Sequence, residues 1–106
     1  MAQTREEQIK EVLKLDPNDA MVQFTLGSHY LDEARYEDAV EPFEKAVELN
    51  AKYSAAWLGL GRALYGADRD DDAKTALEKA IEVANANGDL KVRNEARELV
   101  EQIDEF

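Results

Sequence analysis

The segment Glu44-Lys45-Ala46-Val47-Glu48 recurs as Glu78-Lys79-Ala80-Ile81-Glu82, 34 residues further along the chain. The same offset relates Leu26-Gly27 to Leu60-Gly61. Thirty-four residues is the length of a helix–turn–helix unit, and it fits neither a propeller blade nor a leucine-rich repeat. The offset therefore predicts a chain built from repeated helix pairs.

Within each copy the apolar residues follow a helical period. From Ala39 to Leu49, and again from Ala73 to Ala84, they recur at three- and four-residue steps between charged residues, which is typical of an amphipathic helix. The preceding segments, about Asp19–Leu31 and Tyr53–Tyr65, are apolar over more of their circumference. Each copy is therefore expected to pair an inner helix, with neighbours on two sides, with an amphipathic outer helix.

Further helices are expected at both ends of the chain. The apolar residues of Ile9–Leu15 are followed by Asp16-Pro17-Asn18, where proline stops a helix because it pushes the preceding residue out of helical geometry. Asn87-Gly88 is a helix stop, and Asp89 is a plausible N-cap for an apolar stripe between Leu90 and Ile103. These two helices bring the expected total to six.

The recurring positions resemble the tetratricopeptide repeat family, which shows an apolar–glycine pair, an aromatic residue, then alanine, a large apolar residue and alanine at fixed spacing. The matching residues are Leu26, Gly27, Tyr30, Ala39, Phe43 and Ala46 in the first copy, and Trp57, Leu60, Gly61, Leu64, Ala73, Leu77 and Ala80 in the second. The family's tryptophan is Gln23 in the first copy, and its helix-opening tyrosine is Tyr36 in the first copy but Asp70 in the second.

The resemblance implies an all-α fold, a right-handed α-solenoid of antiparallel helix pairs. It divides a single domain, residues 1–106, into a half-repeat helix (1–19), two repeats (20–53 and 54–87) and a capping helix (88–106). With one residue inserted, Val92, Ala96 and Leu99 match the family's first-helix positions. This capping helix is expected to cover the open end of the core.

Composition and charge exclude several functional classes. The chain has no cysteine, and His29 is its only histidine, so thiolate metal sites, thiol nucleophiles and multi-histidine metal sites are not expected. The net charge of −11 argues against nucleic-acid and anionic-membrane partners. The acidity is explained either by attraction of a basic partner or by solubility alone.

The candidate chemical motifs do not predict an enzyme. Asp68–Asp72 has the alternating carboxylates that open a calcium loop, but the sixth and twelfth positions are Ala73 and Lys79 in place of glycine and glutamate. We therefore interpret the segment as a helix N-terminus. No nucleophile and base are paired around His29. The sequence predicts no catalytic residue, no metal and no cofactor.

The family resemblance implies that ligands bind in a concave groove lined by the first helix of each pair. The expected groove residues are Phe24, Ser28, Leu31, Leu58, Arg62, Tyr65, Arg93 and Arg97. Arg93 and Arg97 are four residues apart, so they can hold one anionic group together. The alternative for the arginines is weak pairing with Glu95, Glu98 or Asp32.

The leading hypothesis is a cytoplasmic scaffold module for protein–protein interaction. Its ligand is a peptide or partner protein with an apolar anchor and an acidic residue or C-terminal carboxylate. The alternative is a structural or self-association segment of a larger solenoid, and the chain is expected to be a monomer or to self-associate weakly. No apolar run approaches the ~20 residues that cross a bilayer, and residues 1–7 lack the order of a signal peptide.

Overall fold

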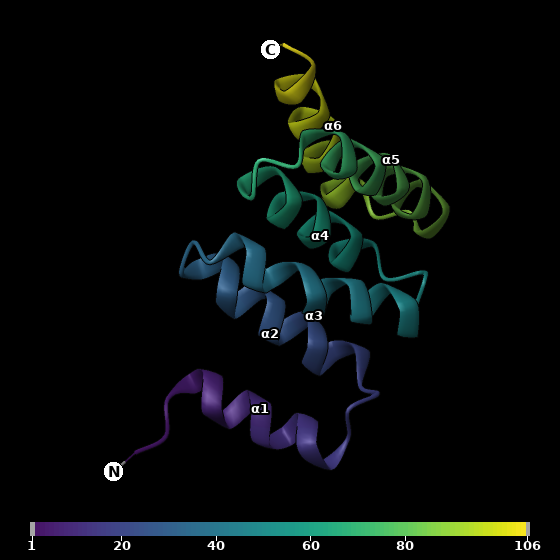
Figure 1. Ribbon diagram of the computed structural model, residues 1–106. Helices are drawn as coiled ribbons and strands as arrows, with labels where there is room; N and C mark the ends of the chain where they lie inside the picture. Colours follow the sequence, from purple (N-terminus) through teal and green to yellow (C-terminus); the bar gives the residue numbers. More distant parts are fainter. Residues whose placement is uncertain (1, 106) are drawn as a thin grey trace.

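The computed structural model describes residues 2–105 and folds them entirely into helices and turns. The six helices are α1 (Arg5–Leu15), α2 (Ala20–Asp32), α3 (Tyr36–Leu49), α4 (Ser54–Gly66), α5 (Asp70–Asn87) and α6 (Leu90–Asp104). Figure 1 shows them stacked in chain order, with α1 at one end of the molecule and α6 at the other. The predictions of an all-α fold and of six helices are confirmed.

Helix ends follow the capping chemistry of the sequence. α1 begins with a capping box, in which the Thr4 side chain accepts from the Glu7 amide and the Glu7 side chain accepts from the Thr4 amide. Gly88 ends α5 in the left-handed conformation, with φ of 71°. The Asp89 side chain then caps α6 by accepting from the Val92 amide. The expected stop at Gly88 and cap at Asp89 are therefore confirmed.

The turns inside the two helix pairs are copies of one another. Ala34 and Asp68, which are 34 residues apart, both have positive φ, at 57° and 62°. Arg35 and Arg69 follow them as the residues before α3 and α5. Asp70 and its neighbours lie in the first turn of α5, as expected for a helix N-terminus.

The core is centred on two large side chains that pack against glycines of neighbouring helices. Phe43 and Leu77 are the largest fully buried side chains among residues 2–105. The Phe43 ring lies against both Gly27 of α2 and Gly59 of α4, where any Cβ would overlap it. Leu77 lies against Gly61 in the same way. Phe43 therefore joins its own helix pair to the next one.

α5 is longer than its counterpart α3, and α6 begins later in the sequence than the repeat predicts. α3 has 14 residues, whereas α5 has 18. The N-cap residues of α2, α4 and α6 are Asp19, Tyr53 and Asp89, so the spacing rises from 34 residues to 36. Val92 and Ala96 are buried and Leu99 packs against the core, as expected from the alignment with one inserted residue.

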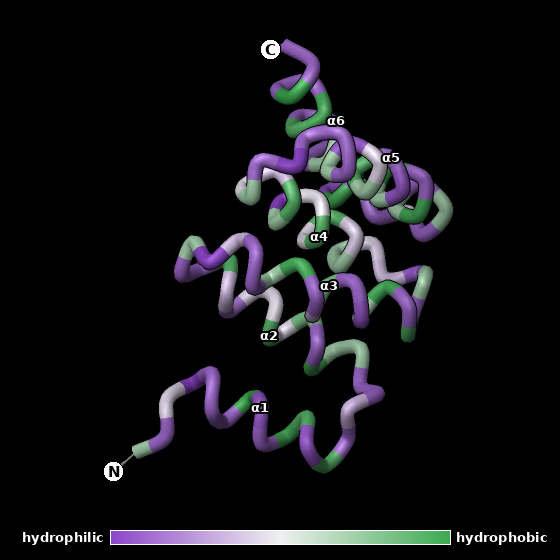
Figure 2. Tube along the Cα trace, viewed as in Figure 1, coloured by the Kyte–Doolittle hydropathy of each residue, from purple (hydrophilic) through white to green (hydrophobic). Residues whose placement is uncertain are grey.

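The hydrophobic positions serve the core of a small helical stack. Figure 2 shows them along the helices, with hydrophilic positions between them. Across residues 2–105, no helix combines the length and the apolar character that crossing a bilayer needs. α1 contributes less to the core than the other helices, with Ile9 as its one buried residue in the described part of the chain.

Candidate partner-binding surfaces

The inner helices α2, α4 and α6 border a hollow of about 750 Å³, called the inner hollow below. Its lining residues are Leu31, Asp32, Tyr36, Arg62, Tyr65, Gly66, Asp68, Asp70 and Leu99. Leu31, Arg62 and Tyr65, three of the residues predicted for the groove, therefore meet at one place. They meet because the 34-residue period puts Leu31 and Tyr65 at the same position of successive inner helices.

Two apolar residues of the inner hollow were missed by the sequence prediction. Leu99 comes from α6, and Tyr36 comes from the start of α3. The Tyr36 ring lies against Gly66, where a Cβ would overlap it. Tyr36 is at the family's helix-opening tyrosine position, but its contact with Gly66 depends on how α3 packs against α4, which the sequence pattern does not show.

Arg62 reaches the inner hollow as a paired cation. Its Nη2 lies 3.1 Å from Oε2 of Glu95 on α6. This is the pairing that the sequence left open as the alternative for the arginines. Both side chains are partly exposed, at 49% and 34%. Exposed pairs of this kind contribute roughly 0.2–1 kcal/mol, so Glu95 holds Arg62 only weakly.

Arg93 and Arg97 are not brought into the inner hollow. Each is two residues from Glu95, which places it about 160° away from Glu95 around the helix. Arg93 donates instead to Oδ1 of Asn94, from Nε at 3.3 Å and from Nη2 at 3.2 Å. Arg97 is exposed. Both arginines therefore lie outside the lining of the inner hollow.

The remaining predicted groove residues on α2 and α4 are partly or fully buried in the packing of the helices. Phe24 stacks on Tyr53, with ring centroids 5.0 Å apart, and meets Phe43 edge-on at 5.8 Å. Burial raises the pKa of Tyr53, and the negative charge of Asp19 raises it further. Leu58 is only 4% exposed, and Ser28 is half-buried. Little of Leu58 is therefore open to a ligand.

Three aspartates surround the inner hollow. Asp32, Asp68 and Asp70 are all exposed. Within the described chain, none of them lies within 4.0 Å of a lysine or arginine nitrogen, the distance that defines an ion pair. The local field at the inner hollow is therefore negative, although Arg62 lies within it.

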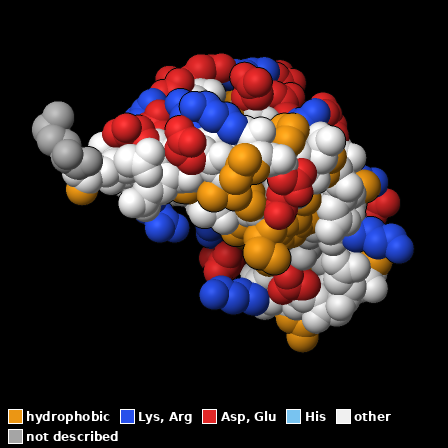
Figure 3. Space-filling model, turned by 90° about the horizontal axis from the view of Figure 1, so that it is seen from below, with side chains coloured by type: hydrophobic (Ala, Val, Ile, Leu, Met, Phe, Trp, Pro, Cys, Tyr) orange, Lys and Arg blue, Asp and Glu red, His pale blue; other side chains and the backbone are white. Residues whose placement is uncertain are grey.

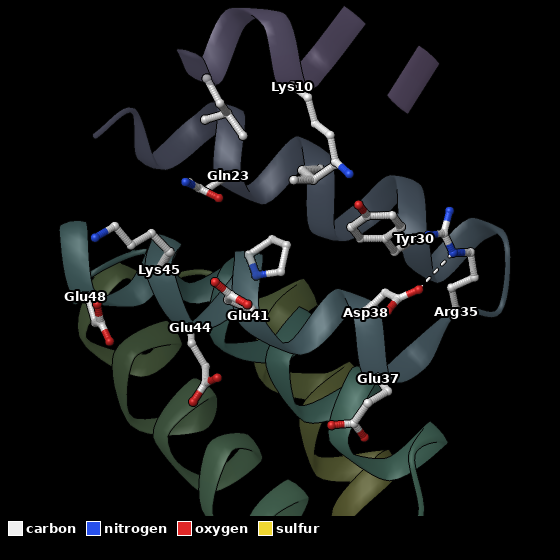
Figure 4. Close-up of a pocket in the computed structure, with 13 residues that line it drawn as sticks. Lys10, Gln23, Tyr30, Arg35, Glu37, Asp38, Glu41, Glu44, Lys45 and Glu48 are labelled. Carbon is white, nitrogen blue, oxygen red and sulfur yellow. Dashed lines mark hydrogen bonds and ion pairs between the residues drawn. The ribbon is translucent and has the colours of Figure 1, made fainter. Parts of the chain in front are cut away.

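Two further hollows lie on the outer helices. The first outer hollow, of about 830 Å³, has walls from α1 and α3 and a floor from α2. Figure 4 shows Gln23 and Tyr30 of α2 at its back, with Lys10 on one side and the acidic face of α3 on the other. The second outer hollow, of about 590 Å³, has walls from α3 and α5 and a floor from α4.

The two outer hollows are copies related by the repeat. All eleven lining positions of the second hollow have a counterpart 34 residues earlier in the first. Gln23 corresponds to Trp57, and Glu41 corresponds to Thr75. The first hollow is lined in addition by Leu13 and Glu37.

An ion network ties α1 to the turn between α2 and α3. Arg35 Nη1 donates to Oε1 of Glu6 at 2.6 Å and to Oε1 of Glu33 at 3.1 Å. Lys10 Nζ lies 2.9 Å from Oε2 of Glu6, and the Tyr30 hydroxyl donates to the same atom. Hydrogen bonds from Lys10 and from Arg35 lower the pKa of Glu6 to about 2. Glu6 in turn raises the pKa of Lys10.

The same network contains the one group in residues 2–105 whose side chains converge closely enough to hold a metal. The ligand atoms of Glu6, His29 and Glu33 all lie within 4.8 Å of one another. Arg35 already binds both carboxylates. The geometry is therefore explained by the ion network, with His29 at its edge, 3.5 Å from Glu33.

Apolar side chains are also exposed near the N-terminal end. Leu15 is 89% exposed, Met21 68% and Val12 48%. Figure 3, which views the molecule from this end, shows hydrophobic side chains gathered near the middle of the face, with acidic and basic side chains around them. This end therefore offers a second apolar surface, separate from the inner hollow.

Comparison with known proteins gives consistent matches. The family model described as "Tetratricopeptide repeat" matches residues 30–91. A TPR repeat-containing protein of Pseudomonas aeruginosa is 32% identical over 98 residues, covering 92% of this chain and 93% of that protein. The solution structure of a Bordetella parapertussis protein superposes with a TM-score of 0.84 at 25% identity, covering 98% of this chain and 90% of the other.

A solved complex shares the fold. The first TPR of Spaghetti, bound to the HSP90 peptide SRMEEVD, superposes with a TM-score of 0.83 at 21% identity. The match covers 94% of this chain and 75% of that one. At this level of identity the likeness concerns the fold of the helices and leaves their surface chemistry open.

Proposed function

This chain belongs to the tetratricopeptide repeat family, and we propose that it binds an extended peptide segment of a partner protein at its inner hollow. The family is one of protein-interaction modules. The observation that carries the proposal is the convergence of Leu31, Tyr65 and Leu99, from three successive inner helices, around one open space of about 750 Å³. A hollow of this size accommodates a large apolar side chain of a ligand.

The charges around the inner hollow favour a basic segment beside the apolar anchor. The sequence had suggested an acidic residue or a C-terminal carboxylate as the ligand. Of the three arginines behind that suggestion, Arg62 alone lines the hollow, and it is bound to Glu95. Asp32, Asp68 and Asp70 are available to pair with lysine or arginine of the ligand. We therefore favour a peptide with one large apolar residue flanked by cations.

A peptide library tests this function. Each peptide carries one leucine between basic, neutral or acidic flanks, with its C-terminus either amidated or free, and binding is measured by calorimetry. We expect basic, amidated peptides to bind best. Changing Leu31 and Tyr65 together to serine is expected to weaken binding at least tenfold, because the anchor loses its apolar contacts.

Charge variants complete the test. Changing Asp32, Asp68 and Asp70 together to asparagine is expected to weaken basic peptides about tenfold, since each exposed pair contributes roughly 0.2–1 kcal/mol. Asparagine tolerates the positive φ of residue 68, so the turn is kept. The matched control is Asp16→Asn, on an exposed aspartate outside the hollow. Preferential binding of free-carboxylate or acidic peptides would contradict the proposal.

A second candidate function rests on the apolar N-terminal end. Leu15, Met21 and Val12 are exposed on or beside α1, and a self-associating or longer solenoid would cover such a surface. Light scattering over a range of concentrations distinguishes this role. Self-association that is abolished by Val12→Ser with Leu15→Ser supports it, and a monomer at all concentrations argues against it.

A further inference from the structure

The second outer hollow indicates what the first one lacks. In the second, the Trp57 ring occupies the floor, and its Nε1 donates to the Ala51 carbonyl at 2.9 Å. At the corresponding place in the first, Gln23 Nε2 donates to the Pro17 carbonyl at 3.2 Å. The hydrogen bond is thus kept, while the large ring is absent. The space that an aromatic ring fills in one copy is open in the other.

The surroundings of that space remain suited to an apolar ring. Leu13, Leu26 and Pro42 line the first outer hollow from three different helices. Leu26 and Pro42 are buried, so they form a fixed apolar surface. Packing a large ring against such side chains is favourable in proportion to the apolar area that it buries.

The first outer hollow has unpaired carboxylates along one wall, although five acidic and three basic residues line it against four and two in the second. Glu41, Glu44 and Glu48 line it from α3, and no lysine or arginine within the described residues lies within 4.0 Å of their carboxylates. In the second hollow, Thr75 replaces the first of these glutamates, and Glu82 is paired with Lys79 at 3.5 Å. Three unpaired carboxylates along one wall complement a positively charged segment.

We propose that the first outer hollow is a docking site for a tryptophan side chain carried on a basic segment of a partner protein. The indole takes the place that Trp57 takes in the second hollow, and flanking lysines or arginines meet Glu41, Glu44 and Glu48. The site lies on the outer helices, so it is separate from the proposed peptide site at the inner hollow. The net charge of −11 adds a long-range attraction for the same partner.

A blocked peptide, acetyl-Lys-Arg-Trp-Arg-Lys-amide, is the probe. Binding to the full chain is followed by calorimetry and by amide chemical shifts of the ¹⁵N-labelled protein. We expect saturable binding with Kd of about 10–1000 μM, and shift changes centred on Gln23, Lys45 and Glu48. Replacing tryptophan with glycine, or the four cations with glutamate, is expected to weaken binding at least tenfold.

Two sets of substitutions test the space and the charges of the first hollow separately. Gln23→Trp fills the space with the chain's own ring and is expected to weaken the probe at least tenfold. Changing Glu41, Glu44 and Glu48 together to glutamine tests the charges independently of the space, with about tenfold weakening expected. The control, Glu78→Gln with Glu82→Gln, alters equivalent carboxylates at the second hollow and is expected to leave binding unchanged.

The outcomes separate this proposal from the function proposed for the inner hollow. Loss of probe binding in the variant with serine at residues 31 and 65, with Gln23→Trp unaffected, would overturn the outer-hollow proposal. An absence of saturable binding up to ~1 mM would overturn it too. So would self-association of the unliganded chain that Gln23→Trp abolishes, because a second copy would then be the occupant. Loss of probe binding in Gln23→Trp, with binding at the inner hollow retained, is the supporting result.

Discussion

The helix pair α2–α3 and the helix pair α4–α5 have the same backbone plan and differ in what fills it. Both turns contain a residue of positive φ, and both are followed by an arginine. The large core residue is Phe43 in the first pair and Leu77 in the second, whereas the outer floor residue is Gln23 in the first and Trp57 in the second. The first pair therefore has the larger core side chain, and the second has the larger side chain on the outer floor. The same backbone accommodates both combinations, and the two outer hollows differ in volume.

The largest expected effect comes from truncating the large core residue of each helix pair. Phe43→Ala is expected to lower the free energy of unfolding by about 3–5 kcal/mol, and Leu77→Ala by about 2–4 kcal/mol. The first loss is greater because the Phe43 ring is packed between two helix pairs. Urea unfolding monitored by circular dichroism measures both. An equal or larger loss for Leu77→Ala would remove the distinction between the pairs.

The next effect tests the floor residue. Trp57→Gln copies the first pair and keeps a donor for the Ala51 carbonyl, so it isolates the missing ring volume. We expect a loss of about 2 kcal/mol in the free energy of unfolding. Trp57→Phe is the control, because it keeps a ring but removes the donor, and a smaller loss is expected. A greater loss for Trp57→Phe would show that the hydrogen bond outweighs the packing.

The smallest effect concerns α1, which forms one wall of the first outer hollow. The pKa of Glu6 is lowered to about 2, so the stabilisation by its partners is complete above its ordinary pKa of 4.5 and is lost as the pH falls toward 2. Hydrogen exchange is expected to show faster opening of α1 over that range, with α4 and α5 little changed.

A substitution identifies the cause of that pKa shift. Lys10 is the largest contributor, so Lys10→Gln is expected to raise the pKa of Glu6 toward its ordinary value, as followed by NMR titration. Lys14→Gln is the matched control, because Lys14 pairs with Glu11 instead. An unchanged pKa of Glu6 in Lys10→Gln would contradict the assignment.

The fold could be predicted from the sequence because the repeat pattern consists of residues that pack against neighbours close to them along the chain. The expected inner helices, about Asp19–Leu31 and Tyr53–Tyr65, are observed as Ala20–Asp32 and Ser54–Gly66. Small residues at fixed spacing and an apolar stripe every three or four residues leave few other packings. Capping residues such as Asp89 also indicated where helices begin.

The candidate sites could be predicted only in part. Leu31, Arg62 and Tyr65 were found because the period carries through α2 and α4. Arg93 and Arg97 do not line the inner hollow, and their role in ligand binding stays a prediction. The outer hollow was missed although Gln23 was visible as a departure from the family. Its space depends on where α1 lies, and that is a tertiary property.

The contact of one ring with two glycines has a consequence for cooperativity. In a nearest-neighbour description of a repeat array, stability divides into terms for each unit and terms for each junction. Phe43 belongs to both kinds, because Gly27 is in its own unit and Gly59 is in the next. Opening either helix pair exposes the ring and removes a junction term for the other. We therefore expect the central four helices to unfold as one cooperative unit and α1, whose one buried residue in the described chain is Ile9, to open separately.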